Sequence, residues 1–278
     1  MKKGILLAAV ILLGAVGFAQ AQEELSGTID VTYQSAYLWY GFDMYPGAHG
    51  EGVILPSIDL DLYGTGLGLN VLWSRANTGA VNKGVSFENQ ERIDLTLSYS
   101  NSYFEYETYA TYYSVGWTYY EYPDEPSDLM DMQEIFASLS WPEICPESIV
   151  PSYTIVRLWK SESGHPSSQP GLTTNDVSGW IHIFGLGYDM PVEGLLPDIP
   201  EQILHLSAAA VYNEGAGGIN MDHDWSHFVL GVSTDFDLGN DLTLTPGVYH
   251  QKVLEKRLSR FNDDEDVTWV SLSLKYAF

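Results

Sequence analysis

The feature that most constrains this chain is an alternation of apolar and polar side chains with a period of two residues. From Ile93 to Tyr99 every second residue is apolar, and the residues between them are Asp94, Thr96 and Ser98. The pattern recurs in three further segments, 57–62, 228–237 and 269–278. This period places successive side chains on opposite faces of a β-strand. The alternation therefore predicts an all-β protein built from strands with one apolar and one polar face.

Comparable runs occur throughout the chain, and no long segment has helical periodicity. Counting them predicts about twelve strands, with ten or fourteen as alternatives, because the segments 151–161 and 203–213 alternate weakly. The predicted strands span 27–41, 53–63, 66–76, 91–100, 103–119, 132–141, 151–161, 178–190, 203–213, 225–238, 241–254 and 267–278.

The predicted connections alternate between short and long. Tight turns at Gly64-Thr65, Asn101-Ser102 and Gly239-Asn240-Asp241 have residues suited to hairpins. Longer polar connections follow the odd-numbered strands, at 42–52, 77–90, 121–131, 162–177, 214–224 and 255–266. Short turns at one end and long loops at the other are typical of outer-membrane barrels. The sequence thus predicts an antiparallel up-and-down transmembrane β-barrel, although the Pro-bearing connections 142–151 and 191–200 are long for periplasmic turns.

The first residues have the pattern of a signal peptide. Lys2 and Lys3 precede an apolar run that ends near Phe18, and Ala19-Gln20-Ala21 supplies a small-x-small cleavage site. We expect residues 1–21 to be removed on export and residues 22–278 to form the barrel domain. No later apolar run approaches the length of a spanning helix, so any membrane crossing must use strands. The expected location is the outer membrane of a Gram-negative-type bacterium.

Tryptophans fall near one end of the predicted strands. Indole favours the lipid headgroup region, where rings of aromatic residues form the girdles of membrane barrels. The predicted girdle consists of Trp39, Trp73, Trp117, Trp159, Trp180, Trp225 and Trp269 at one rim, with Tyr276 and Phe278 at the other.

Two resemblances to known proteins follow from these residues. The last strand, which alternates from Val270 and ends in Phe278, resembles the C-terminal signature that the barrel-assembly machinery recognises. The segment 31–74 is similar to the opening hairpins of an uncharacterised exported family, Gcw_chp. This similarity rests on Ser35, Tyr37, Tyr40-Gly41, residues 56–60 and Trp73-Ser74. It implies an outer-membrane barrel and no particular substrate.

The charge of the chain limits its partners. Lys and Arg number 12 against 37 Asp and Glu, which gives a net charge of -25. Nucleic-acid binding is excluded, because its affinity comes mostly from clustered cations. The only cysteine, Cys145, has no defined role and excludes an intramolecular disulfide and multi-cysteine metal sites.

The polar face of the strands predicts the lining of the lumen. It is acidic, and a carboxylate-lined pore attracts cations. The predicted lumen residues are Asp59, Asp61, Asp94, Glu105, Glu107, Glu134, Asp235 and Asp237, with Arg157 and Lys275 as the main cations. We therefore expect a porin-like channel for passive passage of small solutes, with a preference for cations. Its partners would be outer-membrane lipid, the assembly machinery and small solutes or cations.

Two other classes of function remain open from the sequence. One is a non-transporting barrel that serves as a receptor or structural protein. The other is a lipid-modifying enzyme, but the chain has no Gly-x-Ser-x-Gly elbow, and we assign no catalytic residue or cofactor. Acidic runs at Asp263–Asp266 and Asp222–Asp224 are more typical of solvated loops than of calcium sites, and we assign no metal.

Overall fold

The computed structural model describes residues 24–45, 52–77, 81–82, 85–86, 91–123, 131–145, 148–161, 178–194, 201–216, 223–254 and 266–278. The predicted signal peptide lies outside these ranges. Within them, no helix has the length and apolar character needed to span a membrane. The strands are β1 (Ser26–Gln34), β2 (Leu38–Trp39), β3 (Phe42–Asp43), β4 (Val53–Asp61), β5 (Leu67–Ala76), β6 (Val81–Asn82), β7 (Val85–Ser86), β8 (Glu91–Tyr103), β9 (Thr111–Glu121), β10 (Met132–Ser140), β11 (Ile149–Lys160), β12 (Gly179–Glu193), β13 (Glu201–Glu214), β14 (His223–Thr234), β15 (Phe236–Gly239), β16 (Leu242–Val253) and β17 (Val267–Ala277).

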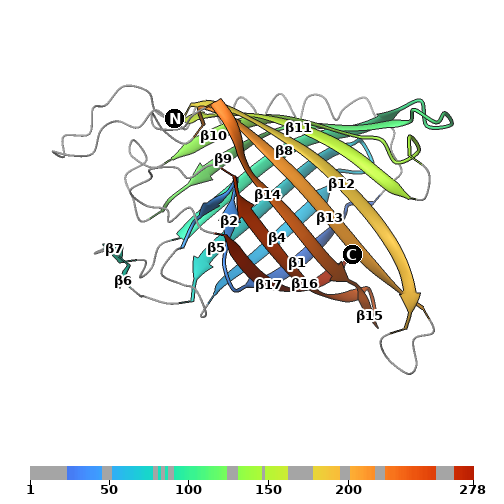
Figure 1. Cartoon of the computed structure of the whole chain (residues 1–278). Coiled ribbons are helices and arrows are strands. Elements are labelled where there is room, and N and C mark those ends of the chain that lie inside the picture. The colour runs from blue at the N-terminus through green and yellow to red at the C-terminus, as the bar shows by residue number, and fades with distance from the viewer. Residues whose placement is uncertain are drawn as a thin grey trace.

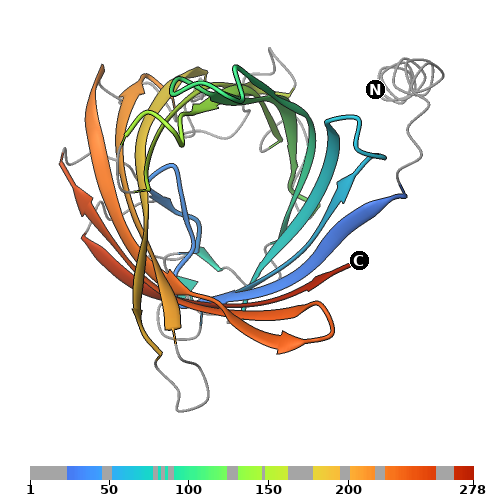
Figure 2. The same ribbon diagram turned by 90° about the vertical axis from the view of Figure 1, so that its right-hand side faces the viewer.

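Thirteen of these strands form one closed antiparallel barrel (Figures 1 and 2). The order is β14-β13-β12-β11-β10-β9-β8-β5-β4-β1-β17-β16-β15, and the pairing of β14 with β16 closes the ring. Since β15 continues β14 after Asp235 and both pair with β16, the thirteen strands occupy twelve positions in the wall. We call each of these positions a stave. The predicted fold class and strand number are confirmed.

The apolar face of the strands lies on the outside of the barrel. Val31 on β1 lies opposite Leu274 on β17, and these side chains are 46% and 41% exposed. The neighbouring pair, Thr32 and Ser273, points into the interior. A water-soluble β-protein would bury its apolar face, whereas a wall that contacts lipid exposes it.

Several predicted strands have different bounds in the structure, and the first, fourth and fifth differ most. The first strand ends at Gln34 instead of continuing to residue 41, because the chain turns into the barrel after that residue. The fourth stave, β8, continues through Asn101-Ser102 to Tyr103, so the predicted tight turn there is wrong. The reversal lies at 104–110, where Phe104 adopts a positive φ of 59° and accepts a hydrogen bond from the Glu107 amide.

The connections at the rim where β1 begins and β17 ends are short. Gly239, Asn240 and Asp241 all have positive φ values, of 78°, 54° and 62°, which confirms the predicted turn there. The strands flanking the predicted connection 191–200 are longer than expected, since Glu193 still pairs with Glu201.

Candidate functional site

The segment Ser35–Tyr45, which we call the plug, folds into the interior of the barrel (Figure 2). It contains the short hairpin of β2 and β3, in which Trp39 lies opposite Phe42. The turn residues Tyr40 and Gly41 both have positive φ, 49° and 86°. Such a pair is typical of a two-residue type I′ hairpin turn, in which glycine carries the larger positive φ without strain.

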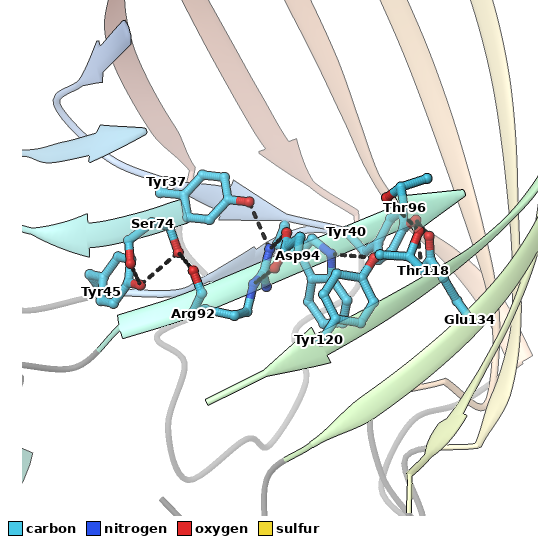
Figure 3. Close-up of polar contacts among 11 residues, drawn as sticks. Tyr37, Tyr40, Tyr45, Ser74, Arg92, Asp94, Thr96, Thr118, Tyr120 and Glu134 are labelled. Carbon is cyan, nitrogen blue, oxygen red and sulfur yellow. Dashed lines mark hydrogen bonds and ion pairs between the residues drawn. The ribbon is translucent and has the colours of Figure 1, made fainter. Parts of the chain in front are cut away.

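The main anchor of the plug is Arg92 on β8 (Figure 3). This side chain is fully buried, and its Nε and Nη2 each donate to Asp94 at 2.7 Å. Nη2 also donates to the Tyr37 hydroxyl at 2.7 Å. The guanidinium carbon lies 4.9 Å from the ring centroids of both Trp39 and Tyr120. The ion pair and the rings offset much of the cost of burying this cation, and Nη1 is buried without a hydrogen-bond partner among the described residues.

Hydrogen bonds attach the plug to strands on other parts of the wall. The Tyr40 hydroxyl donates to Glu134 on β10, at 3.0 Å to Oε2, and the Tyr45 hydroxyl lies 2.9 Å from Ser74 Oγ on β5. The side-chain amide of Gln251 on β16 donates from Nε2 to the Gly41 carbonyl at 3.3 Å. Because β10, β5 and β16 occupy separate positions in the ring, the plug spans part of the interior.

Apolar contacts complete the attachment. Trp39 and Tyr40 pack against a buried cluster that consists of Tyr120, Val156, Leu158, Ile181, Val211 and Ala216. Val156, Leu158, Ile181 and Val211 belong to β11, β12 and β13 and point inward, where the sequence led us to expect polar side chains. The plug therefore explains why the alternation is weak at 151–161 and 203–213.

Burial also controls the ionisation of the plug phenols. Burial is the largest cause that raises the pKa of Tyr37 to about 12, and burial followed by the Glu134 charge raises the pKa of Tyr40 well above its ordinary value. The raised pKa values keep both hydroxyls protonated further into the alkaline range, and Tyr40 must be protonated in order to donate to Glu134.

The wall between the plug and the rim where β1 begins carries small polar side chains. Adjacent hydroxyls bond each other across strands, as between Ser100 and Ser114 at 3.0 Å and between Ser138 and Thr154 at 2.7 Å. The same face continues through Ser140, Ser152, Gly185, Gly187 and Ser207, whereas the Tyr249 ring covers Gly231 and Gly247. The side chains here are short for the interior of a twelve-stave barrel.

The predicted lumen residues fall into separate groups. Asp94 and Glu134 are inward and buried, but both are engaged by the plug contacts. Asp59 and Asp61 lie on the inward face of β4, where Asp59 accepts from Asn70 at 3.3 Å. Lys275 lies on the same face, opposite Asp30.

Asp235 and Asp237 lie near the rim where β1 begins, and they line a pocket of about 420 Å³ together with His205. His205 Nδ1 is 2.7 Å from Asp189, and its Nε2 is 3.7 Å from Asp235. Sequence reasoning did not single out His205, because the alternation is weak in the segment 203–213 that contains it.

Three predicted lumen residues are elsewhere. Glu105 and Glu107 lie in the exposed turn between β8 and β9, since β9 begins only at Thr111. Arg157 points outward, because it lies beside Trp180 and Ile135 on the apolar face of the wall. These assignments to the lumen are wrong.

Two of the predicted girdle tryptophans also lie inside the barrel. Trp39 belongs to the plug, and Trp269 is 8% exposed on the inward face, stacked against Tyr249 at 5.4 Å between ring centroids. Their place near a strand end did not reveal their face. The remaining members lie on the outward face, namely Trp73, Trp117, Trp159, Trp180, Trp225 and Tyr276. Phe278, which follows β17, is 46% exposed, and the girdle itself stays a prediction.

No cluster of three or more potential metal ligands occurs within the described ranges. Asp222 and residues 263–265 of the acidic runs lie outside them, while Asp266 pairs with Lys252. Cys145 is a free thiol of intermediate exposure.

The plug turn leads to a testable prediction at Gly41. A Cβ there would lie 2.5 Å from His227 Nδ1, and φ is +86°. We expect Gly41→Ala to lower the free energy of unfolding by roughly 2 kcal/mol or more, because left-handed strain and steric overlap add. Urea unfolding of the barrel in lipid vesicles measures this change.

Gly239→Ala is the matched control. Its φ is +78°, but a Cβ there meets nothing within 4 Å, so only strain remains. Equal losses for the two variants would show that the Gly41 turn does not pack against His227.

Comparisons with solved structures find chains of similar shape at low sequence identity. No protein-family model matches the sequence, and no curated protein matches it. The KdgM porin in complex with disordered oligogalacturonate is 8% identical, with a TM-score of 0.49 over 91% of this chain and 99% of that chain. The COG4313 outer membrane channel from Pseudomonas putida F1 is 11% identical, with a TM-score of 0.48 over 94% and 98%. LpxR from Salmonella typhimurium is 9% identical, with a TM-score of 0.43 over 91% and 100%.

Proposed function

We propose that this chain is an outer-membrane channel for passive passage of small solutes, with the plug as its constriction. The observation that carries the proposal is the small polar lining between the plug and the rim where β1 begins. Side chains can fill an eight-strand barrel, but a twelve-stave barrel is wider. Serine, threonine and glycine on such a wall leave room for water, which a solute can displace.

The proposed channel prefers cations. Inward carboxylates that the plug does not engage include Asp30, Asp59, Asp61, Asp189 and Asp235. Among the described residues, the inward cations are Lys160, Lys275 and Arg92, and Arg92 is neutralised by Asp94. Carboxylates that line a pore with low-dielectric walls concentrate cations in the pore and repel anions from it.

Reversal potentials in planar bilayers under a salt gradient test the proposal. We expect a cation-selective potential that falls by roughly half when Asp30→Asn and Asp59→Asn are combined, because two wall charges are lost. The control is Glu105→Gln with Glu107→Gln, which removes the same charge from a turn outside the wall. Anion selectivity, or equal effects of the two pairs, would contradict the proposal.

The proposed location also assigns a role to the last strand. The Phe278 amide and carbonyl both bond to Gly27, at 3.0 Å each, so the C-terminus forms part of the seam between β17 and β1. We propose that this strand is the segment presented to the barrel-assembly machinery after export.

The plug also supports a second candidate, a barrel that does not transport. Its anchors on several strands could close the lumen, as in a receptor or a structural protein. Absence of current from correctly folded barrel in a bilayer would favour this function over the channel.

A further inference from the structure

Arg157 lies on the outward face in a row of side chains that includes two tryptophans. The pairings of β9, β10, β11 and β12 place Trp117, Ile135, Arg157 and Trp180 side by side in that order. Ile135 and Trp180 are 48% and 39% exposed. The guanidinium is therefore on the surface that faces lipid, at the level where indole rings collect.

This arginine is set apart by its partners. The guanidinium carbon is 5.5 Å from the Trp180 ring centroid, and that stacking is its contact among the described residues. Two other outward basic side chains have carboxylate partners, Arg75 with Glu91 at 3.2 Å and Lys252 with Asp266. Arg157 thus presents hydrogen-bond donors to the membrane, and no carboxylate in the described ranges receives them.

The surroundings determine which anion can do so. A charge at the hydrocarbon centre is costly, whereas arginine beside tryptophan is stable at the headgroup level. The protein itself carries a net charge of -25, so it repels dissolved anions as a whole. Lipid phosphates are present at this depth at high local concentration, and a guanidinium binds phosphate through two parallel hydrogen bonds.

We propose that Arg157, supported by Trp180, binds the phosphate of an anionic lipid headgroup in the leaflet at this rim. Trp180 holds the guanidinium plane against the wall by stacking, which leaves its free edge toward the lipid. The site lies on the opposite side of the wall from the lumen and does not depend on permeation.

Native mass spectrometry of the intact barrel in detergent, titrated with phosphatidylglycerol, tests the proposal. We expect Arg157→Gln to weaken binding of the tightest lipid roughly tenfold, the loss of about one charge-assisted contact. Trp180→Leu should weaken it less, since the charge remains. Arg75→Gln is the matched control and should leave binding within roughly twofold, because this outward arginine already pairs with Glu91.

Further measurements separate the alternatives. Heat-dependent gel migration establishes that each variant is folded, and Arg157→Lys serves if Arg157→Gln does not fold, with an intermediate loss expected. Equal lipid binding by wild type and the Arg157 variant would overturn the proposal. So would binding of inorganic phosphate as tight as that of the lipid. The reversal potential should not change in Arg157→Gln, and a change would show that the residue faces the lumen.

Discussion

Replacing residues 37–44 with an equally long Gly-Ser linker is expected to raise the single-channel conductance at least roughly twofold, since pore diameter limits ion flow. The exchange removes Tyr37, Trp39, Tyr40 and the β2-β3 hairpin from the interior. It leaves the twelve staves and the backbone hydrogen bonds between them unchanged. Planar-bilayer recordings of refolded protein measure the effect.

A control and a smaller variant make this result interpretable. Exchange of turn residues 104–109 for Gly and Ser alters the rim where β1 begins, away from the plug. This exchange should leave the conductance near the wild-type value. Trp39→Ala with Tyr40→Ala retains the backbone of the plug and should give an intermediate conductance if the full exchange fails to fold. Unchanged conductance in both plug variants would show that the constriction lies elsewhere.

Arg92→Ala is expected to lower the free energy of unfolding by roughly 3–5 kcal/mol, because it leaves the buried Asp94 carboxylate without its partner. It also removes the donor to Tyr37 and the cation between Trp39 and Tyr120. Urea unfolding of the barrel in lipid vesicles gives the value.

The double variant Arg92→Met with Asp94→Leu separates charge from packing. It removes both charges while keeping apolar volume, so much of the stability should return. Arg75→Gln, at a pair whose arginine side chain is 46% exposed, should change stability by less than about 1 kcal/mol. A double variant as unstable as the single one would mean that the plug depends on the hydrogen bonds and not on charge balance.

The face of a residue could be predicted wherever one strand face meets lipid. Ile93 to Tyr99 and Val270 to Tyr276 alternate cleanly, because hydrocarbon accepts only apolar side chains and the interior of the barrel tolerates polar ones. Where the plug covers the wall, Val156, Leu158 and Ile181 are apolar on the inward face as well. Because both faces of this segment are apolar, the sequence predicted the wrong face for Arg157.

The candidate site itself could be predicted only in fragments. Asp94 and Glu134 were recognised as inward carboxylates, and Tyr37, Tyr40 and Ser74 belong to the segments that resemble the exported family. Their joint role depends on contacts between residues as distant as Gly41 and Gln251. Nothing in the spacing of the residues along the chain indicates that these positions meet.

Sequence alone determined that this chain forms a barrel of about twelve strands with an apolar exterior, because a two-residue period follows directly from strand geometry and one-sided contact with lipid. Tertiary structure alone decided that Ser35–Tyr45 enters the lumen, that Trp39 and Trp269 are internal and that Arg157 is external. The physical reason is that the residues Tyr40-Gly41 determine only that the chain reverses locally. Whether the hairpin enters the lumen depends on its contacts with Arg92, Glu134 and the apolar wall. These groups are distant in the sequence and come together only when the barrel closes.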